Sequence, residues 1–405
     1  MTAPGWARRR VVVVVGARLS GAVTAHALAP WSGDVLLVER TVPGRFWPQQ
    51  VTWDRRDNLL WAGLGLLDTV LGCGAPRLRG HTRRTMDSGP DGAPDVVVEC
   101  RYPDDDEYCY RMSIAREVLD PALAARAAQH GNVQLLRPAR VVCPLLDGGR
   151  VRGVVVEHQG VRAEVPATLV VLADGRRSRL PGQVGAHAYD TVASPWSAML
   201  AYHRGLPLPA DHTWYTRRPG SMLIVTPTGP DQWCVAAALH ADLIAGQGGH
   251  PVRVYHRTVA ADPVAGPAVA AGTAMTPVGG ATRLGMHRRP MAGPGWCLVG
   301  DSGLHLDPMS ALGGHAALVT AQLLQARVAD LGGVSADPTH YADLTTRRDA
   351  LLRGDWEATR RIISSYQPAP EAVERARRLA GDPAALDADV RARMGLPARA
   401  PVVAR

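Results

Sequence analysis

The feature that most constrains the fold is a strand–turn–helix–strand pattern near the start of the chain. Val11–Val15 form an uninterrupted β-branched run, as expected of a parallel strand that is buried on both faces. Gly16 ends the run, and an alanine-rich segment at 22–29 with high helix propensity follows it. A second apolar run at 35–38 ends on Glu39. The pattern predicts a βαβ unit.

A secretory leader is the alternative interpretation of this segment. Arg8, Arg9 and Arg10 precede the apolar run, and small residues follow it at 27–29, as in a leader with a cleavage site. However, Arg18 would place a charge inside the apolar part of such a leader. We therefore favour the βαβ unit and expect a cytoplasmic protein.

Composition narrows the class of protein further. No apolar run reaches the roughly 18–20 residues that span a bilayer, so we expect no stable membrane insertion. The net charge is +8, and all 45 basic residues are arginines, which indicates a compositional bias rather than a nucleic-acid partner. The six cysteines show neither a CxxC pair nor zinc-ligand spacing, so we expect reduced thiols and no metal site.

The turn of the βαβ unit suits a dinucleotide. A helix N-terminus offers unpaired N–H groups and a positive dipole end to a pyrophosphate. Gly16 permits the tight turn and Gly21 close packing, while Glu39, 18 residues later, lies where an acid binds ribose hydroxyls. Arg18 replaces the middle glycine of GxGxxG and either obstructs the pyrophosphate or helps to bind it. A plain βαβ unit with small residues at its turn remains the alternative.

Two later motifs also place a carboxylate at the end of a strand. An apolar run at 167–172 leads into Asp174-Gly175, and a run at 296–299 leads into Asp301. Carboxylates in such positions can hold the hydroxyl groups of a polyol.

Glycine and arginine residues mark two helix starts. Gly313-Gly314 precede an alanine-rich helix predicted at 316–326, and their bare N–H groups suit an oxygen-rich ligand edge. Arg116 heads a segment with a helix predicted at 121–129.

With these motifs in this order, the chain resembles the FAD-dependent oxidoreductases of the aromatic-hydroxylase type, the single-component flavoprotein monooxygenases. It is most similar to the branch near the geranylgeranyl reductase-like proteins, and the resemblance runs from about residue 11 to about residue 390. The resemblance implies an α/β fold. A Rossmann-like FAD-binding domain is expected, with an antiparallel β-sheet substrate domain and C-terminal helices.

The motifs and the resemblance together predict three regions. Alternating Trp, Tyr, Thr and Val residues in the middle of the chain favour the sheet, and a helical pattern follows it. The expected ranges are 9–80, 108–182 and 286–334 for a discontinuous FAD-binding domain, 81–107 and 183–285 for the substrate-binding sheet, and 335–405 for the helical region.

The resemblance implies non-covalent FAD, with Glu39 on the adenosine ribose and Asp301 on the ribitol chain. The cofactor-binding residues that it implies are Gly16, Ala17, Arg18, Ser20, Gly21, Glu39, Arg40, Arg116, Val141, Asp174, Gly175, Asp301, Pro308, Gly313 and Gly314.

Two histidines are candidate catalytic residues. His305 lies between two motif elements and is a candidate acid or base near the flavin. His315 stands at a predicted helix start, next to the glycines. For each, a structural role is the alternative: a backbone-bonded histidine in a tight loop for His305, and a packing role for His315.

The resemblance implies a monooxygenase of secondary metabolism. It would use NAD(P)H and O₂ to hydroxylate or epoxidise a hydrophobic, polycyclic or polyketide-like small molecule, with a separate flavin reductase as an alternative electron source. A reductase or dehydrogenase acting on a C=C bond and a redox-silent FAD-containing cyclase remain open. The chain has no lysine and no Trp-x-Trp-x-Ile-Pro motif, so we expect no halogenase.

Overall fold

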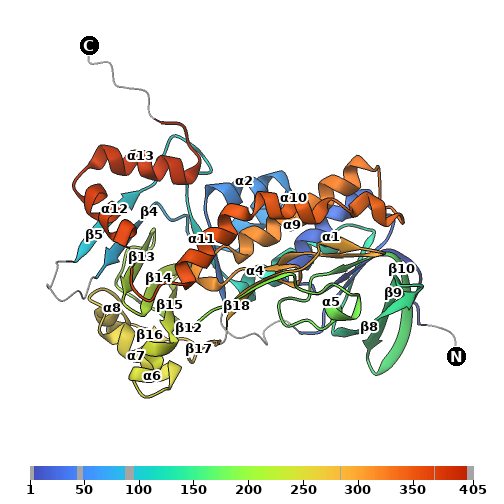
Figure 1. Cartoon of the computed structure of the whole chain (residues 1–405), viewed down its shortest axis with the longest axis horizontal. Coiled ribbons are helices and arrows are strands. Elements are labelled where there is room, and N and C mark those ends of the chain that lie inside the picture. Colours follow the sequence, from blue (N-terminus) through green and yellow to red (C-terminus); the bar gives the residue numbers. More distant parts are fainter. Residues whose placement is uncertain (1–3, 43–48, 87–94, 283, 369, 399–405) are drawn as a thin grey trace, which may run out of the picture.

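The computed structural model describes residues 4–42, 49–86, 95–282, 284–368 and 370–398. Figure 1 shows two large sheets side by side, with the last helices of the chain extending across both. This arrangement confirms the predicted α/β fold class.

The first sheet has a parallel core in which β1 is central. The predicted βαβ unit is present, because β1 and β2 pair in parallel and α1 connects them. The C-terminal half of β10 flanks β1 on its other side, and β20 follows β10. The elements of this core are β20 (Trp296–Leu298), β10 (Val161–Leu172), β1 (Arg10–Val15), α1 (Leu19–Leu28), β2 (Val35–Val38) and β7 (Val133–Leu136).

Three strands extend the first sheet beyond its parallel core. The N-terminal half of β10 pairs in antiparallel fashion with β9, and β9 pairs with β8. At the other end, β19 pairs with β20. The bounds are β8 (Ala139–Asp147), β9 (Arg150–His158) and β19 (Ala292–Gly293).

The second sheet has eight strands. Its order is β16-β12-β15-β14-β13-β4-β5, with β17 also paired to β12. The strands are β4 (Gly80–Thr85), β5 (Val96–Arg101), β12 (Trp196–Arg204), β13 (His212–Arg218), β14 (Ser221–Gly229), β15 (Gln232–His240), β16 (Thr273–Ala274) and β17 (Gly279–Ala281).

Two features of the second sheet differ from the predicted all-antiparallel layer. β4 and β13 run in parallel, because β4 arrives from a distant part of the chain rather than through a hairpin. Three helices also interrupt the predicted strand region: α6 (Ala241–Gly246), α7 (Pro251–Ala260) and α8 (Ala265–Ala271). The apolar side chains of α7 and α8 pack on one face of the sheet. The prediction for this region relied on residues typical of strands, and it therefore missed these helices.

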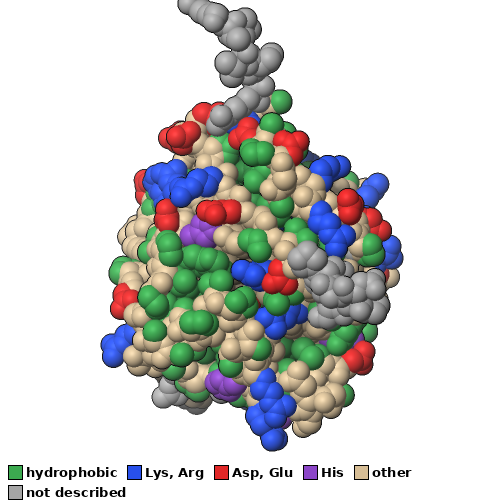
Figure 2. Space-filling view, turned by 90° about the vertical axis from the view of Figure 1, so that its left-hand side faces the viewer, with side chains coloured by type: hydrophobic (Ala, Val, Ile, Leu, Met, Phe, Trp, Pro, Cys, Tyr) green, Lys and Arg blue, Asp and Glu red, His purple; other side chains and the backbone are tan. Residues whose placement is uncertain are grey.

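The last part of the chain is helical, as predicted. α12 and α13 cover β5, where Leu379, Val390 and Met394 pack on Val96 and Val98. The helices are α9 (Gly313–Asp330), α10 (Leu344–Leu351), α11 (Arg353–Ile363), α12 (Pro370–Ala380) and α13 (Pro383–Met394). Figure 2 shows the end of the molecule that carries α12 and α13, where acidic and basic side chains are interspersed.

One predicted helix boundary was wrong. α4 (Arg116–Ala128) begins at Arg116, so Pro121 lies inside the helix rather than at its start. Pro121 has no N–H to bond to the carbonyl of Glu117, but the ion pair between Arg116 and Asp120 stabilises the first turn.

The smaller elements connect these layers. They are η1 (Ala29–Trp31), β3 (Gln50–Trp53), α2 (Arg55–Gly63), α3 (Leu67–Leu71), β6 (Met112–Ala115), α5 (Leu180–Gln183), β11 (Asp190–Ala193), β18 (Gly285–Arg288), η2 (Gly300–Ser302), β21 (Leu304–His305), η3 (Pro308–Ser310) and η4 (Pro338–Tyr341). In the part of the chain that the structure describes, no helix combines the length and apolarity needed to cross a membrane.

Candidate cofactor site

The turn between β1 and α1 depends on two glycines. Gly16 has φ +95°, a backbone conformation that favours glycine. A Cβ atom on Gly21 would lie 1.7 Å from the carbonyl oxygen of Gly16, so a side chain there would push α1 away from β1. Arg18, at the N-cap of α1, makes no side-chain capping hydrogen bond, and Asp120 accepts the Leu19 N–H, which leaves the next backbone donors of the first turn for a ligand.

Glu39 lies beside this turn at the end of β2. Its Oε2 accepts the Ala17 N–H at 2.8 Å, and its Oε1 accepts the N–H and hydroxyl of Thr41. A carboxylate has further acceptor capacity. Glu39 also lines a small cavity together with Ala17, Arg18, Thr41, Asp120, Pro121, Ala124 and Arg137. Glu39 thus places an acceptor for a ligand hydroxyl beside the turn.

Asp120 holds the two predicted arginines in place. Its carboxylate accepts Arg18 Nε at 2.7 Å and Arg116 Nε at 2.7 Å, and it also accepts the Leu19 N–H at 3.1 Å. Sequence analysis missed Asp120, although its spacing of four residues from Arg116 on one helix was a signal. The ion pair directs Arg18 toward α4, and the guanidinium stays beside the turn rather than filling it.

Asp174 and Gly175 lie at the end of β10, directly beside the third motif. The Gly175 N–H donates to the Ser302 hydroxyl at 3.2 Å, so Ser302 connects the two motifs. Asp174 Oδ2 accepts the Ser178 hydroxyl, while Asp174 Oδ1 is buried without a hydrogen-bond partner among the described residues. Burial raises the pKa of Asp174.

Asp301 lies in η2, immediately after β20. Its Oδ1 is 3.2 Å from His305 Nδ1, and it is 4.0 Å from where a Cβ of Gly313 would be. The side chain keeps 40% of its accessible surface although protein atoms surround it, which places it in a recess. Burial would raise the pKa of Asp301, but His305, Arg116 and His287 outweigh burial and lower it. Asp301 is therefore an anionic acceptor facing the start of α9.

His305 is enclosed next to Asp301. Its Nε2 is buried with no hydrogen-bond partner in the described ranges. Its ring lies 5.7 Å from that of His287, and His287 Nε2 contacts the Asp301 carbonyl at 3.0 Å. Burial, with Arg289 and His305, lowers the pKa of His287 to about 4, so His287 is neutral at pH 7.

Gly313 and Gly314 form the first residues of α9. Leu312, at the N-cap, makes no capping hydrogen bond with its side chain, so the N–H groups of the first turn are available. A Cβ atom on Gly314 would lie 2.5 Å from the ring of Trp53 on β3. The second glycine therefore lets the start of α9 pack against β3.

His315 points into a different environment from Asp301. Its Nδ1 lies 2.8 Å from Asp57 Oδ1 on α2, and its Nε2 lies 3.6 Å from Asp355 Oδ2 on α11. Both ring nitrogens are thus paired with carboxylates. This geometry favours the structural alternative for His315, as the residue that joins α2, α9 and α11.

Four other predicted residues lie near the motifs without direct polar roles in the structure. Ser20 packs against Gly300, Arg40 is exposed, and Pro308 is exposed at the start of η3. Val141 on β8 packs against the apolar cluster under the first sheet and does not line the cavity beside Glu39.

One face of the second sheet carries a row of half-buried side chains, one from each of five neighbouring strands. Cross-strand partners share a face, so this set, the open row, lies along one line. Its members are Leu200, Ala236, Ile224, Tyr215 and Arg83. On the opposite face, side chains of β12, β14 and β15 are buried under α7 and α8.

The open row lies between two elements of the motif region. On one side, the Tyr202 hydroxyl donates to the Gln49 carbonyl at 2.7 Å, and Thr226 donates to Ser113 of β6 at 3.0 Å. On the other side, neighbouring residues of the sheet pack with Met309 and Leu312, which precede Gly313. The row therefore opens toward the start of α9 and provides an apolar surface there.

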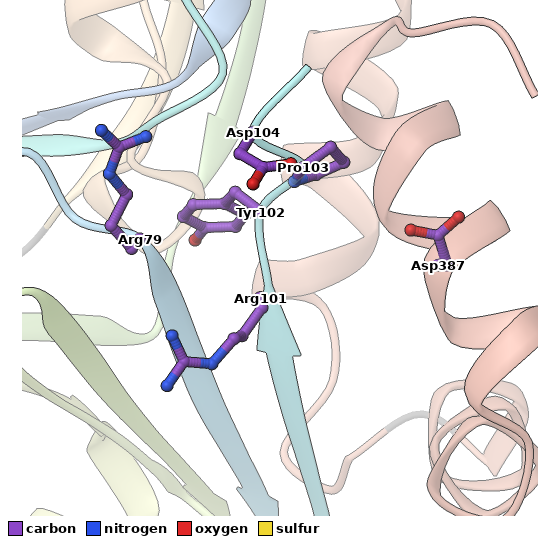
Figure 3. Close-up of a pocket in the computed structure, with 6 residues that line it drawn as sticks. All are labelled: Arg79, Arg101, Tyr102, Pro103, Asp104 and Asp387. Atoms are coloured by element: carbon purple, nitrogen blue, oxygen red, sulfur yellow. The ribbon is translucent and has the colours of Figure 1, made fainter. Parts of the chain in front are cut away.

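A cavity of about 510 Å³ lies elsewhere, between the end of β5 and α13. Figure 3 shows Arg79, Tyr102 and Arg101 on one side and Asp387 on α13 across from them. None of the predicted cofactor residues lines this cavity. Among the residues that the structure describes, no group of three or more His, Cys, Asp or Glu side chains is arranged to hold a metal.

Solved structures with the same fold include two flavin enzymes. The p-nitrophenol 4-monooxygenase of Pseudomonas putida aligns with a TM-score of 0.77 at 16% identity, covering 97% of this chain and 99% of that one. A myxobacterial chondrochloren halogenase, an FAD-dependent enzyme, aligns with a TM-score of 0.75 at 20% identity, covering 96% and 90%. At these identities the likeness is one of fold.

A sequence relative and a family model extend the comparison. The digeranylgeranylglycerophospholipid reductase 2 of Methanopyrus kandleri is 28% identical over 352 residues, which is 85% of this chain and 82% of the relative. The model of the FAD binding domain family matches residues 9–331 and so includes every motif described above. The chain therefore belongs to the FAD binding domain family of FAD-dependent oxidoreductases.

Proposed function

We propose that this protein is a monooxygenase that uses NAD(P)H and O₂ to hydroxylate or epoxidise a hydrophobic small molecule. The open row, an apolar surface that faces the first residues of α9, supports a hydrophobic substrate, and the alignment with the p-nitrophenol 4-monooxygenase over 97% of this chain favours oxygen insertion. A hydrophobic substrate on this row would lie next to the predicted flavin edge, between β6 and the residues that precede α9.

The residues at the motifs fit FAD. The cradle at Gly16 and Gly21 excludes side chains, Asp174 has a buried oxygen without a partner, and Asp301 is an anion in a recess. Glu39 would hold the adenosine ribose, and Asp301 the ribitol chain. When bound, FAD would accept electrons from the nicotinamide and pass them on to O₂ or to the substrate.

The protein's own residues position and protect the reacting region. Arg18 and Arg116, fixed by Asp120, place positive charge beside the pyrophosphate track. Trp53 and Met309 are buried next to the start of α9 and exclude water from it. His305, with Nδ1 3.2 Å from Asp301 Oδ1, would help to orient the Asp301 carboxylate.

A reductase acting on a C=C bond is the second candidate. The sequence relative in Methanopyrus kandleri is named as a reductase of an unsaturated phospholipid, and the alignment with it covers most of both chains. The open row would accept a polyene as well as a polycyclic substrate, so the surface alone favours neither reaction.

Whether an oxygen atom from O₂ enters the product distinguishes the monooxygenase from the reductase. The FAD-loaded protein is incubated with NADH or NADPH, isotopically labelled O₂, and either 2-naphthol or geranylgeraniol as a hydrophobic probe. A monooxygenase gives a product that contains one labelled oxygen atom. A product that has gained two hydrogen atoms under anaerobic conditions would replace the proposal with the reductase. Conversion without oxidation of the nicotinamide would indicate the cyclase.

A further inference from the structure

The open row ends on an arginine that belongs to a group of three. Arg83 lies beside Tyr215 in register, and Arg111 donates to the Tyr215 hydroxyl at 3.3 Å. Burial and the charges of Arg83, Arg111 and Arg393 together lower the pKa of His81 far below its usual range. The charges of three guanidinium groups therefore act on one buried imidazole, whose ring lies 5.5 Å from that of Tyr102 and 5.7 Å from that of Tyr215. We refer to Arg83, Arg111 and Arg393 as the arginine cluster.

Within the described ranges, fewer carboxylates than arginines contribute to the arginine cluster. Arg393 pairs with Asp389 at 2.8 Å, whereas neither Arg83 nor Arg111 makes an ion pair within the described ranges. Asp54 interacts with Arg111 only at longer range, and Arg111 Nε is buried without a hydrogen-bond partner among the described residues. Enclosed cations are costly where counter-charge is incomplete, so a further anion would stabilise the cluster.

The arginine cluster is charged and reachable. Burial and the positive charges of Arg393 and Arg111 lower the pKa of Arg83 to about 10, so the guanidinium stays protonated at neutral pH. Arg83 and Arg111 keep part of their surface accessible. The rings of Tyr215 and Tyr102 lie 6.0 Å from Arg83 and 5.7 Å from Arg111, which helps to orient the two guanidinium groups.

We propose that the arginine cluster binds the anionic group, a carboxylate or a phosphate, of an elongated substrate whose apolar body lies along the open row. The inference rests on the proposed function, because it assigns the polar end of the same substrate surface. From Leu200 to Arg83 the row crosses four gaps between strands, about 19 Å at the usual strand spacing. Arginine suits both anions because its planar fork donates two parallel hydrogen bonds.

The cavity in Figure 3 is a weaker candidate for the same ligand. Tyr102 borders this cavity as well as the arginine cluster. However, Arg79 and Arg101 share the cavity with Asp104 and Asp387, so its walls carry both charges. An anion gains more in the arginine cluster, where Arg83 and Arg111 form no ion pair with a carboxylate among the residues that the structure describes.

Binding of three matched probes tests the inference without requiring turnover. Decanoate, decyl phosphate and the neutral decanol are titrated into the FAD-loaded protein by calorimetry. We expect at least one of the two anions to bind tenfold or more tightly than decanol, and the better one identifies the headgroup. In Arg83→Gln this preference should fall to threefold or less, while decanol binds as it does to the parent.

The matched control is Arg84→Gln, at the next position on β4. Arg84 pairs with Asp95 at 2.9 Å and points to the other face of the strand, so the preference for the anion should be unchanged. Arg393→Gln, with a side chain that is 37% exposed on α13, supplies a second variant in case Arg83→Gln does not fold. It should also reduce the preference at least threefold.

Each other outcome overturns the inference. If decanol binds the parent as tightly as both anions do, the arginine cluster is not an anion site, although the apolar surface and the proposed function stand. If the preference survives in Arg83→Gln and Arg393→Gln, other residues bind the anion. If no probe binds the parent, the open row is not a substrate surface, and the proposed function loses its support as well.

Discussion

Asp301 lies in a recess and has a pKa lowered by its neighbours, which is typical of a carboxylate that serves a ligand. We expect Asp301→Asn to weaken FAD binding tenfold or more, because it loses charge-assisted hydrogen bonds worth about 1.5–3 kcal/mol each. Fluorescence titration with FAD measures the dissociation constant. The exposed Asp147 provides the control variant Asp147→Asn. An unchanged FAD dissociation constant in Asp301→Asn would remove this residue from the site.

Asp120 is the residue on which the two predicted arginines depend. In Asp120→Asn, Arg18 and Arg116 lose a buried anionic partner. We expect a destabilisation of about 3–5 kcal/mol, the usual range for breaking a buried ion pair, and at least a tenfold loss of FAD affinity. Urea unfolding and FAD titration measure the two effects separately. Full FAD affinity in a destabilised variant would show that Asp120 is structural only.

At the scale of elements, His315 connects α2, α9 and α11, and this connection depends on pH. Burial would lower the pKa of His315, but Asp57 and Asp355 outweigh it and raise the pKa. The stabilisation is therefore complete below the unfolded-state pKa of about 6.5 and is lost as pH rises through the higher pKa of the folded state. Burial also raises the pKa of Asp57, so the pKa values of His315 and Asp57 are both above their usual values.

We therefore expect His315→Gln to lower the free energy of unfolding by about 3–5 kcal/mol at pH 6, because Asp57 is left buried without its partner. The difference from the parent should shrink steadily between pH 7 and pH 9. Urea unfolding at each pH measures it. The exposed His187 gives the control His187→Gln. A difference that grows with pH would contradict the assignment of the ion pairs.

The whole molecule brings the predicted FAD-binding segments together, since these come from the start, middle and last third of the chain. We expect the protein to purify with FAD that denaturation releases, because the ligand contacts segments that only the folded chain assembles. Adding FAD at about 100 times its dissociation constant to the apoprotein should stabilise it by roughly 2.7 kcal/mol, seen as a higher melting temperature. Colourless protein that neither binds FAD nor shifts in melting temperature would contradict the cofactor assignment.

The sequence by itself determined the local units. Five β-branched residues and two glycines encode β1 and the turn into α1, because their conformational preferences act within a few residues. For the same reason, Asp174 and Asp301 could be placed at the ends of strands before the structure was known. The C-terminal helices were likewise predictable from periodicity. In contrast, α6, α7 and α8 were not predicted, because their part of the chain was interpreted from its strand-type residues.

Only the tertiary structure decided which distant residues meet. Asp120 reaches Arg18 across 102 positions, and His315 reaches Asp57 across 258, so no local pattern could indicate either pair. The parallel pairing of β4 with β13 brings Arg83 into line with the open row. The sequence determines which side chains are present. Their burial and their neighbours, which set their charge and their contacts, arise only when remote segments pack together.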